Sequence, residues 1–171
     1  MDKDTLRLFS SYNIETNKRM NAHISGLDSE AWERQFKACF SSIRSLCNHI
    51  YIADFNWLKR FSGLRQFDYI RQDLFRKDIL FSESAFGQID DYLTKRAGLD
   101  KLIDDFISEI NEGDLKSDLS YKDSRGTGHS KNFGGLVLHM FNHQTHHRGM
   151  ISVYLEGLDI ENDFCSLTSV L

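Results

Sequence analysis

Residues 132–158 read NFGGLVLHMFNHQTHHRGMISVYLEGL and carry the clearest helical pattern in the chain. One face of this segment recurs at steps of three and four residues, as an amphipathic helix requires, in Leu136, Met140, His143, His147, Ile151, Tyr154 and Leu158. The helix is expected to start near Asn132, and Gly157 lies at its end. The pattern predicts a helix over this range, with two histidines on its buried face.

Three further segments show the same periodicity, at about 5–25, 41–61 and 83–110. Asp4 is the expected N-cap of the first, and Ser62-Gly63 and Asn111-Glu112-Gly113 are expected stops for the next two. About twenty residues precede each of the last two helices, which is long enough for crossover connections. Leu119-Ser120-Tyr121 comes before a glycine-bearing turn that favours a small hairpin. We expect an all-α four-helix bundle with long crossover connections and a small hairpin before the last helix.

The composition is that of a globular domain, with 40% hydrophobic residues, 27% charged residues and no proline to interrupt long helices. No repeat or low-complexity segment divides the chain, so we expect a single domain over residues 1–171. A net charge of −4 without a long basic run disfavours nucleic-acid binding. Apolar runs are far shorter than the roughly 18 residues needed to cross a membrane, and the first residues are too polar for a signal peptide. The expectation is a cytoplasmic protein with no nucleic-acid or membrane partner.

The cysteines Cys39, Cys47 and Cys165 form an odd set without metal-ligand spacing. We expect three free thiols. Cys39 and Cys47 fall beside apolar positions and are predicted to be small buried side chains.

Four histidines lie within residues 139–147, and His143 and His147 occupy positions where the helical pattern calls for core side chains. A buried imidazole must be hydrogen-bonded or metal-bound, and an i, i+4 spacing brings two ring nitrogens within reach of one ion. A single core histidine is more often hydrogen-bonded, but two stacked on one face favour a metal site. A hydrogen-bond acceptor is then expected beside each ligand ring. His139 is a candidate to line the site, His146 is expected to be peripheral, and the roles of both stay open.

A third ligand is required, and His49 is the preferred candidate because it lies on the flank of the apolar face of the helix at 41–61. His23 and His129 are the alternatives. We rank both below His49, because His23 is near a helix end and His129 is in a glycine-flanked turn.

Several segments together resemble the DinB family of bacterial damage-inducible proteins: Phe40–Ile43, Leu46–Ile50, Asp54–Leu58 and His139–Gly149. The resemblance covers nearly the whole chain. It implies a four-helix bundle related to the bacillithiol- and mycothiol-dependent transferases, a homodimer, and a divalent metal held by His49, His143 and His147. The chain departs from the family at Met150, where glutamine is usual, and the effect of this change on the ligands' hydrogen bonding is left open.

Three neutral histidines without a fourth ligand are typical of catalytic metal sites, which keep one coordination position open. We therefore expect a metal-dependent enzyme, either a thiol S-transferase or a hydrolase, acting on a low-molecular-weight thiol or another small molecule. The alternative is a non-catalytic, stress-induced metal-binding module. Zinc or nickel is the first expectation for the ion, and iron, manganese or copper also suit imidazole ligands. No residue can be assigned as catalytic, because the nucleophile and phosphate-loop motifs GxSxG, GxGxxG and Walker A are absent.

Overall fold

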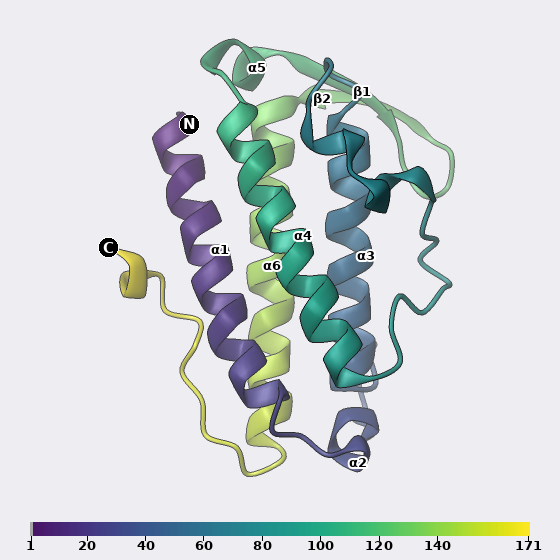
Figure 1. The fold of residues 1–171 in the computed structure, drawn as a ribbon, viewed down its shortest axis with the longest axis vertical. Helices are drawn as coiled ribbons and strands as arrows, with labels where there is room; N and C mark the ends of the chain where they lie inside the picture. Colours follow the sequence, from purple (N-terminus) through teal and green to yellow (C-terminus); the bar gives the residue numbers. More distant parts are fainter. Residues whose placement is uncertain (1) are drawn as a thin grey trace.

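The computed structural model describes residues 2–171, in which long helices pack side by side as a bundle (Figure 1). The long helices are α1 (Lys3–Ile24), α3 (Ile43–Phe61), α4 (Ile89–Glu109) and α6 (Phe133–Glu156). Short elements connect them, namely α2 (Ser29–Glu33), η1 (Tyr69–Arg71), η2 (Asp73–Arg76), α5 (Glu112–Lys116), β1 (Asp118–Lys122) and β2 (Gly128–Asn132), and η3 (Leu167–Val170) follows α6. The expected all-α bundle with a small hairpin before the last helix is confirmed.

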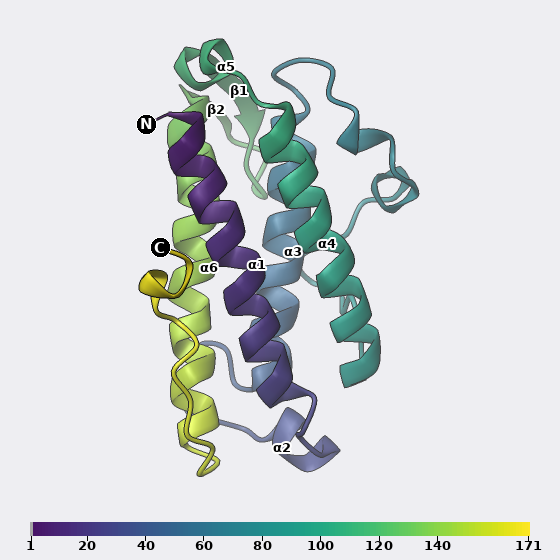
Figure 2. The same cartoon turned by 60° about the vertical axis from the view of Figure 1, so that its left-hand side comes forward.

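The connections differ in what they do for the bundle. Because α3 and α4 run in the same direction, residues 62–88 return the chain along the length of the bundle (Figure 1). The connection from α4 to α6 instead stays at one end, where it forms α5 and the hairpin. After α6 the chain folds back beside the bundle, and η3 packs against α1 (Figure 2).

The hairpin pairs β1 and β2 antiparallel, with Ser120 opposite Ser130. Its turn is closed by the Thr127 carbonyl, which accepts from the Asp123 amide at 3.0 Å. Gly126 has a φ of 83°, a backbone conformation that residues with a side chain rarely adopt. The glycine-bearing turn in the sequence is therefore what allows the chain to reverse here.

Two helix starts differ from the sequence-based expectation. The N-cap of α1 is Asp2 instead of Asp4, since the Thr5 amide donates to Asp2 Oδ1 at 2.8 Å. The third long helix begins at Ile89, not near Glu83. Asn48 of α3 explains the later start: it accepts from the Ala85 amide at 2.7 Å and donates to the Glu83 carbonyl at 3.0 Å, so this backbone is bound to α3.

The core is continuous and rich in aromatic rings. Helix α1 packs on α4, and α3 packs on α6. At the end of the bundle that bears the hairpin, Phe61 stacks on Phe106 at 5.1 Å, and Phe133 meets Phe61 edge-on at 5.4 Å. The long connection adds Phe67 to this cluster, 5.7 Å from Phe106, so residues 62–88 are anchored in the core. No helix of the described residues is long and apolar enough to span a bilayer.

Two arginines are buried at the centre of the bundle, each with only 1% of its surface exposed. Arg96 of α4 donates to Asp54 of α3 at 2.7 Å, and its other terminal nitrogen lies 2.8 Å from Asp100. Arg148 of α6 donates to the side-chain oxygens of two α1 asparagines and of Gln144. The same asparagines, Asn13 and Asn17, donate to Asp100 at 3.1 and 2.8 Å. One polar network thus joins all the long helices through their buried faces.

The three cysteines are free thiols, as expected. Cys47 is buried in the core, and burial raises the pKa of its thiol to about 12. The prediction for Cys39 was wrong. It is exposed because it lies between α2 and α3, in a loop that the helical pattern did not describe.

Candidate metal centre

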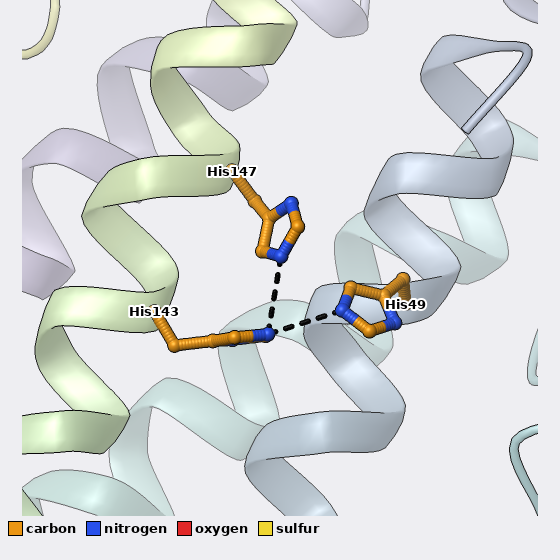
Figure 3. Close-up of side chains that lie close together, drawn as sticks. All are labelled: His49, His143 and His147. Atoms are coloured by element: carbon orange, nitrogen blue, oxygen red, sulfur yellow. Dashed lines mark hydrogen bonds between the residues drawn. The ribbon is translucent and has the colours of Figure 1, made fainter. Parts of the chain in front are cut away.

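Three histidines from the facing helices α3 and α6 point toward one another (Figure 3). His143 Nε2 lies 3.0 Å from His49 Nε2 and 3.1 Å from His147 Nε2. One ligand atom from each ring can be chosen so that all lie within 4.8 Å of one another. The fold therefore brings together the residues that the sequence analysis selected, including His49, which is 94 positions away from His143.

This geometry follows from the positions of the three histidines on their helices. His143 and His147 are one turn apart on α6, so their rings leave the helix on the same side. His49 lies near the middle of α3, on the side that packs against α6. Ser42 and Ser45 fix the start of α3 through a capping box, with hydrogen bonds of 3.1 and 2.9 Å. The position of His49 along the bundle is set by that start.

The donor set fits a transition-metal ion. In a tetrahedral zinc site with bonds of about 2.0–2.1 Å, ligand nitrogens are about 3.3 Å apart, so the two close contacts of His143 are only a few tenths of an ångström short. A neutral imidazole carries one ring N–H and one lone pair. His143 Nε2 carries either one N–H or one lone pair, so it cannot make a well-aligned hydrogen bond to both neighbours at once. A cation at the centre would satisfy all three lone pairs together.

The electrostatics of the site favour neutral rings. Burial, together with the charge of neighbouring histidines, lowers the pKa of His49, His143 and His147 from 6.5 to about 4. The rings are therefore neutral near pH 7. Neutral imidazole is the form that binds a metal, so no proton must be displaced for these side chains to act as ligands.

The acceptors expected beside the ligand rings are not found. The buried Nδ1 atoms of His143 and His147 have no hydrogen-bond partner in the part of the chain that the structure describes. Packing orients the rings instead. The Phe40 ring lies 4.4 Å from that of His49 and meets His147 edge-on at 5.2 Å. The Phe40 carbonyl in turn accepts from the Tyr154 hydroxyl at 2.6 Å, which fixes this loop over the site.

The other histidines lie outside the cluster. His139 is exposed, and its ring is edge-on to Trp57 at 5.4 Å and 6.2 Å from the His143 ring. His146 is exposed beside His147, at 4.8 Å. His23 packs near Phe164, and His129 Nε2 lies 3.0 Å from an Asp123 oxygen. Neither of the alternative third ligands therefore joins the pair on α6.

The fourth side of the centre is apolar. Among the described residues, the group close enough to share an ion consists of the three histidines alone. Phe81, 43% exposed, lies 6.0 Å from the His49 ring on one side, and Phe40 lies on another. Sequence reasoning assigned no role to either ring, because both lie in loops without periodicity. An ion held here would keep a coordination position that no protein ligand fills.

The helix that carries two of the histidines has a second ordered face. Gln144 and Arg148 each follow a histidine by one residue and are fully buried toward α1. Met150 is half-buried and packs against the core. The ligand side of α6 and its network side are thus separate, and the network fixes the rotation of the helix.

Comparison with known proteins gives a consistent result. The model of the DinB family matches residues 1–159, a range that contains α1 to α6 and the three histidines. The curated Protein DinB of Bacillus subtilis (strain 168) is 24% identical over 154 residues, which cover 84% of this chain and 80% of that protein.

Proposed function

Because this chain belongs to the DinB family and brings three imidazoles to one point, we propose that it is a divalent-metal enzyme of the thiol S-transferase or hydrolase type. His49, His143 and His147 are the proposed ligands. The observation that carries the proposal is the convergence of their Nε2 atoms, with contacts of 3.0 and 3.1 Å. The ion would lower the pKa of a bound water or thiol and so supply a nucleophile near neutral pH.

The protein groups around the centre suit such a role. The ligands are neutral near pH 7, so the charge of a divalent ion would not be offset by protein carboxylates. Phe40 and Phe81 flank His49 on the loop side, so the protein groups next to this ligand are apolar. A site with three imidazoles and an apolar rim favours a small uncharged or thiol-bearing group at the remaining position.

The first experiment is metal analysis of the full chain purified without a histidine tag. We expect about one transition-metal ion per chain, since the structure shows one such cluster in residues 2–171. Zinc and nickel are the ions to assay first, followed by iron, manganese and copper. A metal-free protein that also fails to take up zinc or nickel from solution would refute the proposal.

The second experiment tests whether the remaining position is open. Cobalt(II) substitution gives a ligand-field spectrum that changes when a ligand enters, so 2-mercaptoethanol and azide can be titrated into the cobalt form. A saturable spectral change supports an enzyme site. An unchanged spectrum at millimolar concentrations near pH 8 would instead support the non-catalytic metal-binding module.

A further inference from the structure

A cavity of about 560 Å³ lies beside the candidate metal centre, and none of the three histidines lines it. Its walls come from three parts of the fold: the last two turns of α3, the loop at residues 78–82, and the start of the hairpin turn at 122–124. The volume is in the usual range for sites that bind small molecules, about 300–1,000 Å³.

The cavity adjoins the histidine cluster. Phe81 lines it, and the ring of Phe81 lies 6.0 Å from that of His49. Asn56 and Arg60, which also line it, follow His49 on α3 by seven and eleven positions, spacings that return to the same helix face. The rise along α3 from His49 to Arg60 is roughly 16 Å. A long side chain on a helix leans back toward the N-terminus of the helix, so the Arg60 guanidinium lies closer to His49 than this rise. A small molecule could therefore span both places.

Arg60 is held in place but has no acceptor. Its guanidinium carbon lies 4.9 Å from the Trp57 ring centre and 5.8 Å from that of Tyr121. The side chain is half-buried, and over residues 2–171 it makes neither an ion pair nor a hydrogen bond. Burial lowers the pKa of Arg60, and the nearby Tyr121 and Asp123 oppose that shift. A guanidinium is always charged and presents a planar fork of donors that matches a carboxylate or a phosphate.

The acidic groups of the cavity are already engaged. Asp78 pairs with Lys59. Asp123 accepts from the amides of Arg125 and Thr127, both at 2.9 Å, and lies 3.0 Å from His129. In the described chain this leaves Arg60 and the exposed Lys122 as the cations of the cavity without a carboxylate partner. The local charge therefore favours an anion.

We propose that this cavity is an anion subsite in which Arg60, assisted by Lys122, binds a carboxylate or phosphate group of a small molecule. The other end of that molecule would lie at the histidine cluster. The assignment of that end rests on the proposed function, whereas anion binding at Arg60 does not require a metal. The substrate class is thus a small anionic compound, and for a transferase an anionic thiol.

Tryptophan fluorescence gives a direct readout in the metal-free, full-length protein. Trp57 is in contact with Arg60, while Trp32 is buried elsewhere against Phe86 and Tyr92. We would titrate mercaptosuccinate and, separately, inorganic phosphate, and expect a saturable change that is lost in Trp57→Phe. The tighter of the two probes identifies the preferred anion.

Arg60→Gln should weaken the binding of that anion at least tenfold, as expected for loss of a charge-assisted contact. Arg76→Gln is the matched control, because Arg76 is an exposed arginine outside the cavity. Thermal unfolding checks that both variants fold. The subsite would be overturned by equal affinity in the two variants, or by no saturation with either probe up to about 10 mM. Arg60 would then have only the favourable interaction of a cation with the C-terminus of α3.

A cobalt titration separates this inference from the proposed function. If both hold, mercaptosuccinate should perturb the cobalt spectrum at a concentration about tenfold lower than 2-mercaptoethanol, and Arg60→Gln should remove only that advantage. If no thiol perturbs the spectrum but the fluorescence titration still depends on Arg60, the open metal site is refuted and the anion subsite stands.

Discussion

Replacing Arg96 with methionine should destabilise the protein far more than loss of an ordinary ion pair. Arg96 is 1% exposed and contacts Asp54, which is fully buried, at 2.7 Å and Asp100 at 2.8 Å. Methionine preserves much of the volume but leaves both carboxylates without their cation. Breaking a buried pair by removing one partner costs about 3–5 kcal/mol, compared with a total stability of about 5–15 kcal/mol.

The assay is thermal unfolding of the metal-free protein, followed by circular dichroism. For a chain of this size each kcal/mol corresponds to about 2–4 °C, so Tm should fall by about 6–20 °C. The matched control is Lys101→Met on the same helix. Lys101 pairs with Asp105 at 2.6 Å, but its side chain is 73% exposed, and such pairs contribute about 0–1 kcal/mol.

The pH dependence gives an independent check. Burial already raises the pKa of Asp54 to about 6 in the presence of Arg96, and removal of the cation should raise that pKa further. A folded-state pKa above the unfolded value means that acid favours the fold, so the deficit of Arg96→Met should shrink as the pH is lowered toward 5. Adding Asp54→Asn and Asp100→Asn should recover part of the loss at pH 7. Equal Tm values for Arg96→Met and Lys101→Met would refute the reasoning.

Three further predictions concern the metal centre and assembly. Alanine substitution of His49, His143 or His147 should abolish metal binding, because every ring supplies one ligand atom, whereas His146→Ala should retain the metal. Full retention of metal in the His49 variant, measured by elemental analysis, would contradict the ligand set. The pKa values of the three rings are lowered to about 4 in the folded protein and are near 6.5 in the unfolded chain, so the unfolded chain takes up protons first as the pH falls. The stability of the metal-free protein should therefore decrease between pH 6.5 and 4, and a constant Tm over that range would disprove this prediction. We also expect a homodimer, so light scattering should give about twice 19.9 kDa, and a monomer at micromolar concentration would rule this out.

The sequence predicted those parts of the site that depend on local geometry. His143 and His147 face inward because both fall on the apolar face of one helix, and an i, i+4 spacing fixes their relation without any tertiary information. His49 required a further step, since its position on the flank of a second helix indicates only that it can face α6. The structure places its Nε2 3.0 Å from that of His143.

The missed parts depend on contacts between distant segments. Phe40 and Phe81 lie in loops, and no spacing rule brings a loop ring to a particular imidazole. The true start of α4 depends on Asn48, which binds the backbone at residues 83 and 85 from another helix. Arg96 reads as a surface residue, because an i, i+4 pair with Asp100 is typical of an exposed helix face, and only the contact with Asp54 of α3 shows that this face is buried.

The two faces of α6 explain how the ligand rings can be ordered without hydrogen bonds at their buried Nδ1 atoms. A histidine ligand is usually oriented by an acceptor at its second nitrogen, and His143 and His147 have none among the described residues. Arg148, one residue beyond His147, is held by amide oxygens of α1 and of Gln144, so the helix cannot rotate without breaking buried hydrogen bonds. Phe40 then restricts the rings of His49 and His147 from the loop side. In other metal sites a hydrogen bond to each histidine ligand orients its ring. Here the buried polar network and the Phe40 ring orient the ligand rings instead.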